Sequence, residues 1–321
     1  MNWMTCFRKI VIGPKVDLDV CGCALIRLLG GTFDALDEVS MENLFPNIPV
    51  EVVSQGQASP ADLDDESVLC IECGLDDMDW ADKENFDHHI ENGPENSATM
   101  QAFDHVDFLL DHKPIAVSHQ ELVEDFRKAY GSLAEYIDLL DTKGPEALRH
   151  RQKQVRFPTL SDVFAGMLLT ERDPVKQFHE GVRILYNINN PFGTIDGFDQ
   201  YAKAKADNDR QLALAVKRAK WTITKTGHKL AYLETDFYGA PGALYGRGAE
   251  IVIAYSPKFG NPPVPKFTIA GNSIRVNGLL PLLDAQEEGW GGPATGTIIG
   301  SPRGGSKMTL KAVLKIVKDR L

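Results

Sequence analysis

The first half of the chain alternates short apolar runs with longer stretches of helical periodicity. Short apolar runs bounded by polar or turn-forming residues are typical of strands buried in a parallel sheet. The sequence predicts strands at 8–13, 50–55, 67–74 and 84–89. It predicts helices over 20–31, ended by Gly30 and Gly31, and over 120–141. This alternation favours the α/β fold class, with a parallel sheet and helices on both of its faces.

The second half has a different pattern. A segment rich in Asn, Gly and Pro at 187–196 predicts a linker. Helices are predicted over 197–220 and over 307–321, the latter after a glycine-dense loop. Strands are predicted at 221–226, 229–235, 250–257 and 265–271. We therefore expect two domains, one over 1–186 and a smaller α/β domain over 197–321.

The composition is that of a soluble globular protein, because 43% of the residues are hydrophobic and 25% are charged. No run approaches the ~20 apolar residues that span a bilayer, so we expect no membrane association. The apolar run near the N-terminus is too short for a signal peptide. The odd count of 5 cysteines favours reduced thiols over a disulfide framework. The expected location is cytoplasmic.

Charge is shared unevenly between the two halves. Residues 1–185 carry 16 Lys and Arg against 34 Asp and Glu, a net charge of −18, whereas residues 186–321 carry 18 against 11, a net +7. This division is expected if the first domain collects metal cations and the second attracts an anionic substrate. Charged residues that are merely solvated at the surface would produce it as well. The overall acidity disfavours long duplex nucleic acid as a partner, but it is compatible with small phosphates and short oligonucleotides.

Acidic and imidazole side chains follow the predicted strands of the first half, where ligands bind in open α/β sheets. Carboxylates that face one point repel one another unless a cation neutralises them. Oxygen and imidazole ligands suit Mn²⁺ or Mg²⁺. Each residue alone has a simpler interpretation, such as a helix cap at Asp19 or a solvated pair of histidines. The candidates are Asp17, Asp19, Glu72, Asp87, His88, His89 and Asp141.

The order of these residues resembles the DHH family of phosphoesterases, named for the triplet that is here Asp87-His88-His89. The family includes RecJ-type exonucleases, oligoribonucleases, exopolyphosphatases and family II inorganic pyrophosphatases. The resemblance covers nearly the whole chain and implies a DHH metal domain followed by a DHHA1-type substrate domain. It implies Mn²⁺- or Mg²⁺-dependent hydrolysis of a phosphoester or phosphoanhydride in a cleft between the domains. Polyphosphate, a short single-stranded oligonucleotide and a small nucleotide are all compatible substrates.

The resemblance implies a site for one or two metal ions. Glu72 matches the carboxylate that bridges the ions, and Asp17 matches a ligand of the first ion. The residues that match ligands of the second ion are Asp19, His88 and Asp141.

Catalytic and substrate-binding roles follow from the same resemblance. His89 would face the substrate phosphate, and Asp87 would orient His88 through its other ring nitrogen. In the second domain, 273–278 matches an arginine-bearing strand and 289–296 matches a glycine signature whose N–H groups approach an anion. The implied substrate-binding residues are Arg275, Gly291, Gly292 and Arg303.

Three positions depart from the family pattern. Gly13 stands where relatives place His or Asn, Glu72 stands where Asp is usual, and Pro293 stands where His is usual. These departures affect the first ion and the substrate side, so we hypothesise that one ion binds firmly and the other weakly. The alternative function is a degenerate DHH-family protein that binds a nucleotide or phosphate anion with little or no hydrolysis.

The cysteines offer a competing metal site. Cys21 and Cys23 follow Asp19, while Cys70 and Cys73 flank Glu72, so four thiolates could bind zinc or an iron–sulfur cluster. Small buried cysteines are the favoured interpretation, because residues 21 and 23 diverge in a helix. No pattern in the sequence determines the oligomeric state, and a homodimer is compatible with it.

Overall fold

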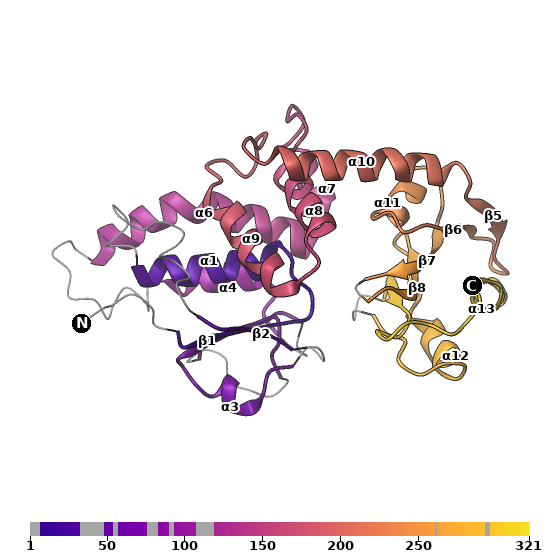
Figure 1. The fold of residues 1–321 in the computed structure, drawn as a ribbon, viewed down its shortest axis with the longest axis horizontal. Coiled ribbons are helices and arrows are strands. Elements are labelled where there is room, and N and C mark those ends of the chain that lie inside the picture. Colours follow the sequence, from indigo (N-terminus) through magenta and orange to yellow (C-terminus); the bar gives the residue numbers. More distant parts are fainter. Residues whose placement is uncertain are drawn as a thin grey trace. The chain divides into compact units, whose positions relative to one another are not determined.

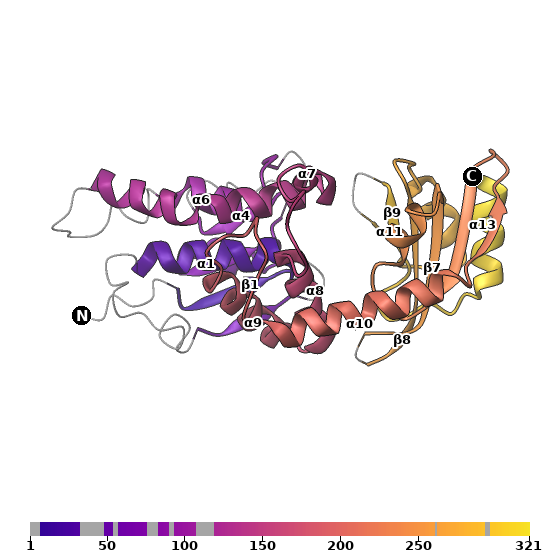
Figure 2. The same ribbon diagram turned by 90° about the horizontal axis from the view of Figure 1, so that it is seen from above.

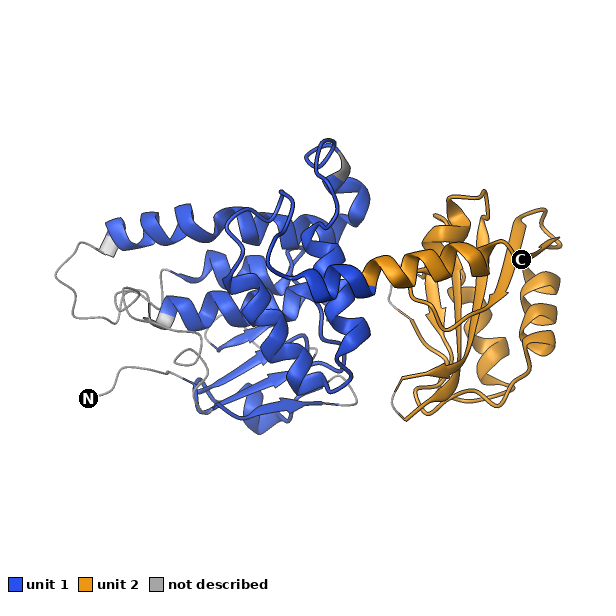
Figure 3. Ribbon diagram, turned by 45° about the horizontal axis from the view of Figure 1, so that its top comes forward, with its two compact units in different colours: residues 1–204 blue, residues 205–321 orange. Residues whose placement is uncertain are grey.

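The computed structural model describes residues 7–32, 48–53, 57–75, 83–89, 93–106, 119–260, 262–292 and 296–321. The chain forms two compact units, residues 1–204 and 205–321, shown in separate colours in Figure 3. Each unit has its own sheet and its own hydrophobic core. The predicted α/β class is confirmed.

The first unit contains a 4-stranded sheet in the order β2-β1-β3-β4, and every neighbouring pair is parallel. Its strands are β1 (Lys9–Ile12), β2 (Val50–Val52), β3 (Val68–Ile71) and β4 (Asn85–Phe86). All lie within the predicted segments but are shorter, because pairing stops where polar residues follow the apolar runs. Since the strands are parallel, their carboxyl ends share one edge of the sheet.

Helices cover the two faces of this sheet unequally. Ile10 and Ile12 of β1 belong to the large core, which packs against most of the helices, whereas Val11 faces a small core on the opposite side. Among the described residues, that opposite face carries only α3 (Pro60–Leu63), as Figure 1 shows. The other helices of the unit are α1 (Leu18–Thr32), α4 (Ala98–Asp104), α6 (His119–Lys143), α7 (Pro145–Arg149), α8 (Leu160–Thr170) and α9 (Pro174–Tyr186).

Helix α1 includes both Gly30 and Gly31 and reaches Thr32, one residue beyond the predicted end, where the described residues stop. Residues 18–30 of this helix are all buried, so tertiary packing outweighs the roughly 1 kcal/mol by which each glycine disfavours a helix. Another glycine of α1 is required by that packing. A Cβ atom at Gly22 would lie 2.5 Å from Ile137 Cδ1 and 2.6 Å from Thr99 Oγ1, so α6 and α4 approach α1 at a position without a side chain.

The segment predicted as a linker, 187–196, packs on the first unit. Ile195 is buried in the large core, and the ring of Phe192 lies 5.3 Å from that of Tyr136. Helix α10 (Asp199–Val216) follows, and the division between the units falls inside it. The predicted linker therefore differs from the structure, because apolar residues between the Asn, Gly and Pro residues find partners on the first unit.

The second unit contains a 5-stranded sheet in the order β5-β6-β7-β8-β9. The pair β6–β7 is parallel and the other pairs are antiparallel. Helices α10 and α11 (Ala240–Tyr245) cover one face, while α12 (Leu280–Asp284) and α13 (Leu310–Arg320) cover the other. The strands are β5 (Lys220–Ile223), β6 (Lys229–Glu234), β7 (Ile251–Phe259), β8 (Val264–Gly271) and β9 (Ile298–Gly300).

Two predictions for the second unit need correction. The segment 273–278 is not a strand, because the chain leaves β8 through Ser273, which adopts a φ of +58°, and enters a short 3-10 helix at Asn277–Leu279. Strand β9 lies in the region predicted as a glycine-dense loop. Within the part of the chain that the structure describes, no helix is long and apolar enough to cross a membrane.

Candidate metal centre

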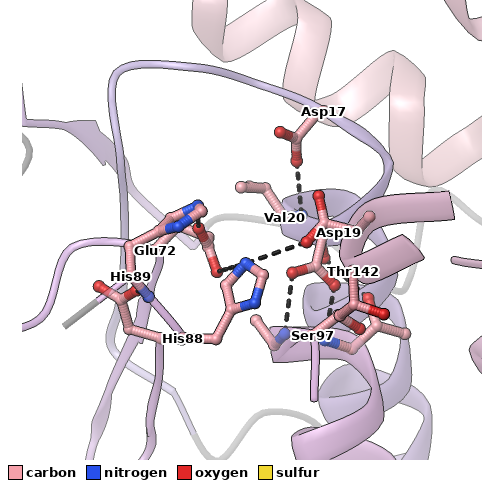
Figure 4. A network of polar contacts seen from close by, with 12 residues as sticks. Asp17, Asp19, Val20, Glu72, His88, His89, Ser97 and Thr142 are labelled. Carbon is pink, nitrogen blue, oxygen red and sulfur yellow. Dashed lines mark hydrogen bonds and ion pairs between the residues drawn. The ribbon is translucent and has the colours of Figure 1, made fainter. Parts of the chain in front are cut away.

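Polar side chains gather at the edge where the parallel strands of the first unit end (Figure 4). Asp19 lies in the first turn of α1, and Glu72 directly follows β3. The triplet Asp87-His88-His89 directly follows β4, and Asp141 lies in the last turn of α6. The structure thus brings together residues from four separate elements, as the parallel topology requires.

These residues form two groups that could each hold a metal ion. One consists of Glu72, His88 and His89, the other of Asp19, His88 and Asp141, and the ligand atoms of each lie within 4.8 Å of one another. His88 belongs to both. Its Nε2 atom lies 2.9 Å from Asp141 Oδ2 and 3.6 Å from Glu72 Oε1, while His89 Nε2 lies 2.6 Å from Glu72 Oε2. Figure 4 shows the His88 ring between the side chains of Glu72 and Asp19.

Two atoms at the centre of these groups lack a hydrogen-bond partner among the described residues. His88 Nε2 and Glu72 Oε1 are both buried, and the short approach of His88 Nε2 to Asp141 does not have hydrogen-bond alignment. A buried polar atom left without a partner costs about 1–3 kcal/mol. A divalent cation bound between these atoms would satisfy both of them, so the residues present fit a metal ion.

Asp19 is held in place by the helix opposite it. Its two carboxylate oxygens accept hydrogen bonds from the backbone N–H groups of Ala98 and Thr99, each at 2.8 Å, and the Thr99 hydroxyl donates to the Asp19 carbonyl at 2.9 Å. Only 2% of Asp19 is exposed. The start of α4 therefore fixes the carboxylate, which is a more specific role than the capping of α1 that the sequence left open.

Asp87 supports the two loops that carry the other ligands. Its Oδ2 atom accepts a hydrogen bond from the N–H of Gly74 at 2.7 Å, and its Oδ1 atom accepts one from the N–H of His89 at 2.7 Å. Both oxygens thus bind backbone, which differs from the implied contact with the His88 ring. Asp87 positions His89 and the segment after Glu72.

Asp17 belongs to neither group of potential ligands among the described residues. Its Oδ1 atom accepts a hydrogen bond from the N–H of Val20 at 3.2 Å, which caps α1, and its Oδ2 atom lies 2.7 Å from Lys15 Nζ. The structure thus places Asp17 outside both groups, and its implied role in holding a first ion stays a prediction. Lys15 was not singled out from the sequence, where it carries no signal beyond its place in the loop before Asp17.

Gly13 touches the backbone of Glu72. A Cβ atom at residue 13 would lie 2.4 Å from the carbonyl oxygen of Glu72, which is closer than any real contact. Glu72 itself adopts a φ of +53°, in a region that costs a residue other than glycine about 1–2 kcal/mol. The Glu72 carboxylate lies beside His88 and His89. The close approach leaves no room for a side chain at position 13.

Burial and mutual repulsion change how the acidic ligands bind protons. Burial, reinforced by the charge of Asp141, raises the pKa of Asp19 to about 6. Burial also raises the pKa of Glu72 to about 7, although His89 opposes this shift. Burial disfavours the charged form of His88, but the carboxylates of Asp141 and Glu72 outweigh it and raise the pKa of His88 to about 9. A bound cation would replace these protons.

The metal-free protein is therefore expected to lose stability as the pH rises from 6 to 9.5. Folding raises the pKa of His88 from 6.5 to about 9, so the stability it contributes is present below pH 6.5 and is lost as the pH rises through 9. Glu72, raised from 4.5 to about 7, acts in the same direction at lower pH. We expect a loss on the order of 2–3 kcal/mol, measured by urea unfolding in EDTA. A flat or rising free energy of unfolding would contradict these shifts.

The substrate-binding residues implied by the resemblance all lie in the second unit. Arg275 is exposed on the loop after β8, and the N–H groups of Val276 and Asn277 donate to the carbonyl of Gly296, at 2.6 and 3.1 Å. Arg275 therefore lies beside the glycine segment. Arg303 is also exposed. The pKa of Lys266 is lowered mainly by burial of its side chain, and the positive charge of Arg303 lowers it further.

The structure gives a reason for glycine at position 292 that the sequence did not reveal. A Cβ atom at Gly292 would lie 2.2 Å from the Ile298 carbonyl oxygen, so glycine allows the segment to lie against β9. Gly291 pairs with Gly300 through two backbone hydrogen bonds of 3.1 and 2.7 Å, but a Cβ atom there would meet no atom within 4 Å, so this pairing does not require glycine. Pro293, which stands where relatives place His, lies outside the described residues.

The cysteines do not form a competing metal site among the described residues. Cys21 and Cys23 belong to the large core, whereas Cys70 and Cys73 belong to the small core on the other face of the sheet. All four are buried, and burial raises the pKa of the Cys21 and Cys23 thiols well above its usual range. Metals bind thiolates, and a raised pKa keeps a thiol protonated, so these cysteines are core residues and not metal ligands.

No protein-family model and no curated protein sequence matches the chain. Three solved structures are similar to it. A DHH domain from a member of a family of ribosomal proteins is 14% identical, with 97% of this chain and 85% of that chain covered and a TM-score of 0.43. RecJ from Thermus thermophilus in complex with Mn²⁺ is 12% identical, with 97% and 51% covered and a TM-score of 0.46.

The third structure is CDC45 from Entamoeba histolytica, 9% identical, with 97% of this chain and 95% of that chain covered and a TM-score of 0.38. The chain spans about half the length of RecJ, at 51%.

Proposed function

We propose that the chain is a metal-dependent phosphoesterase, and that Asp19, His88 and Asp141, with Glu72 beside them, hold one Mn²⁺ or Mg²⁺ ion firmly. The observation that carries the proposal is a pair of buried atoms that have no hydrogen-bond partner among the described residues, His88 Nε2 and Glu72 Oε1. Carboxylate and imidazole ligands without thiolates suit these ions.

When bound, the ion supplies a Lewis acid that polarises a phosphoryl oxygen and lowers the pKa of water. The protein's own residues complete the site. Backbone N–H groups fix the carboxylates of Asp19 and Asp87 and so connect the segments that carry the site. His89, of whose side chain 65% is exposed, lies beside Glu72 and can hold a proton against the oxygen of a substrate phosphate.

The substrate we propose is a small phosphorylated molecule or a short single-stranded oligonucleotide. The net charge of +7 over residues 186–321 and the exposed guanidinium groups of Arg275 and Arg303 favour an anion in the second unit. Planar guanidinium groups bind phosphates with two hydrogen bonds.

One observation favours a second candidate function, the binding of a phosphate anion without hydrolysis. Gly13 offers no ligand, and Asp17 is engaged by Val20 and Lys15, so the positions implied for a first ion are occupied by other contacts. If turnover requires two ions, the remaining centre binds a phosphate but does not cleave it.

The Asp141→Asn variant tests hydrolysis. The substitution keeps the shape of the side chain but removes the charge that faces His88, and we expect hydrolysis with Mn²⁺ to fall at least about a hundredfold. Release of product from bis-p-nitrophenyl phosphate, short oligonucleotides, 3′-phosphoadenosine 5′-phosphate and polyphosphate is the measurement.

The control is Glu124→Gln, which neutralises an exposed carboxylate on the same helix. We expect it to hydrolyse each substrate at the rate of the unchanged protein. Equal rates in Asp141→Asn and Glu124→Gln would exclude the proposed centre. Binding of these phosphates without release of product would select the second candidate function.

A further inference from the structure

A cationic segment directly follows the helix that carries Asp141. Residues 147–157 contain 4 Lys and Arg and no Asp or Glu. The surrounding residues 1–185 carry a net charge of −18, so this segment is a local reversal of sign. An anionic substrate that approaches an acidic unit is repelled by it, and a basic patch near the reacting centre lowers that barrier.

The segment lines a cavity of about 600 Å³, formed by Pro145, Glu146, His150, Gln152, Lys153 and Thr159. The cavity is of the size that binds small ligands. His150 and Lys153 are exposed, and Glu146 is the single acid among the residues that line it. The lining thus balances one lysine against one glutamate, and the surplus positive charge lies in the flanking segment 147–157.

Gln152 adds a donor at this cavity. Its Nε2 atom is buried and has no hydrogen-bond partner among the described residues. The Tyr136 hydroxyl lies beside this amide and is also paired with Ser161 Oγ at 2.7 Å. An amide N–H left without an acceptor is costly, and an oxygen atom of a bound anion would satisfy it.

Neighbouring contacts hold the segment in place. Arg151 lies 2.6 Å from Glu135 Oε1 and stacks over the ring of Phe192 at 5.0 Å from its centroid. Thr194 exchanges two hydrogen bonds with the backbone of Arg156, at 3.2 and 3.0 Å. Because Arg151 is engaged in these contacts, the side chains available to a ligand are those of His150, Gln152 and Lys153.

One lining residue, Pro145, follows closely after the helix that carries Asp141. Pro145 follows Asp141 by four residues, and consecutive Cα atoms are 3.8 Å apart, so the two Cα atoms are at most about 15 Å apart. Figures 1 and 2 both draw α7, which begins at Pro145, just beyond the end of α6. A ligand that reaches both places must be longer than a single phosphate group.

We propose that the cavity beside His150, Gln152 and Lys153 is an anion site that binds a phosphate group of an extended substrate, away from the group at the metal centre. This inference rests on the proposed function, because it identifies the substrate as a chain of several phosphates. The shared chemistry is a phosphodiester or phosphoanhydride chain, and an oligonucleotide or polyphosphate can supply it. The site lies wholly within the first unit and needs no residue of the second.

The test measures binding in EDTA, where no hydrolysis occurs. A fluorescent single-stranded oligonucleotide of about eight nucleotides is titrated with the full-length protein at several salt concentrations. We expect Lys153→Gln to weaken binding about tenfold at low salt, because it removes a charged contact. We expect it also to flatten the slope of log affinity against log salt by about 0.7, the value for one phosphate contact of a single strand. Gln152→Leu is expected to weaken binding without changing that slope.

Lys176→Gln is the control, because it removes an exposed lysine of α9 in the same unit. We expect its affinity and salt slope to match those of the unchanged protein. Lys153 is exposed, so we expect Lys153→Gln to stay folded. The test with this variant therefore still applies if Gln152→Leu does not fold. If Lys153→Gln and Lys176→Gln have the same affinity and slope, the site does not exist.

A competition arm identifies the source of the phosphate chain. Displacement of the oligonucleotide by polyphosphate, with the same dependence on Lys153, assigns the site to phosphate chains in general. Failure of polyphosphate to displace it assigns the site to an oligonucleotide.

The inference and the proposed function can fail separately. Binding that depends on Lys153, in a protein that hydrolyses no phosphate, would exclude the proposed function but retain the site. Hydrolysis that depends on Asp141, with binding indifferent to Lys153, would exclude the site but retain the function.

Discussion

Replacing His88 with alanine is expected to abolish tight metal binding, with the affinity for Mn²⁺ falling at least about a hundredfold. The reason is that His88 Nε2 belongs to both groups of potential ligands and is the buried atom without a partner at their centre among the described residues. Loss of an outer contact of a metal ligand typically costs 10–100-fold in affinity, and loss of the ligand itself costs more. Isothermal titration with Mn²⁺ and the electron paramagnetic resonance of free Mn²⁺ both measure this change.

His228→Ala is the matched control for this experiment. His228 lies in the second unit, where its ring is 3.5 Å from Glu250, and it belongs to neither group. We expect the control to bind Mn²⁺ as the unchanged protein does, and urea unfolding of both variants checks that each is folded under the conditions of the titration. Tight Mn²⁺ binding by a folded His88→Ala protein would show that the metal centre lies elsewhere.

The second large effect concerns stability, at a buried ion pair between α1 and the segment before β4. Arg27, 1% exposed, donates through Nε to Glu84 Oε2 at 2.8 Å and through Nη2 to Glu84 Oε1. It also donates to the carbonyl of His105 at 3.2 Å and lies over the ring of Phe86. We expect Arg27→Met to lower the free energy of unfolding by about 3–5 kcal/mol, because Glu84 is left buried without its partner.

Urea unfolding of the single and double variants separates the charge effect from the packing effect. Arg27→Met with Glu84→Leu is expected to recover most of the lost stability, because both charges are then gone. As a comparison, Arg210 pairs with Asp207 at 2.5 Å on the surface, and Arg210→Met is expected to cost less than about 1 kcal/mol. Equal losses at Arg27 and Arg210 would contradict the burial argument.

Local patterns in the sequence were sufficient for much of the first unit. The four parallel strands lie within the predicted segments, and the long helix predicted over 120–141 is α6, His119–Lys143. Apolar runs and helical periodicity depend on which side chains are buried, and this information is present in neighbouring residues. The positions of Glu72 and His88 just after strands followed from the same patterns.

Local patterns failed where a distant part of the chain decided the outcome. The segment 273–278 was predicted as a strand, but the chain turns at Ser273 and forms a 3-10 helix at Asn277–Leu279. The segment 187–196 was predicted as a linker, but Ile195 is buried in the core of the first unit. Glycine and asparagine weaken local structure, and the partners that compensate for them are remote in sequence.

The roles of individual site residues divide in the same way. The sequence by itself determined which residue types are available, that they follow parallel strands, and therefore that acids and imidazoles converge at one edge. Only the tertiary structure decided that Asp17 caps α1 and contacts Lys15, that Gly13 lies against Glu72, and that Asp87 binds backbone N–H groups. The physical reason is that a parallel sheet brings strand ends to a common edge whatever their sequence. Which atoms then meet depends on differences of an ångström that arise from packing far along the chain.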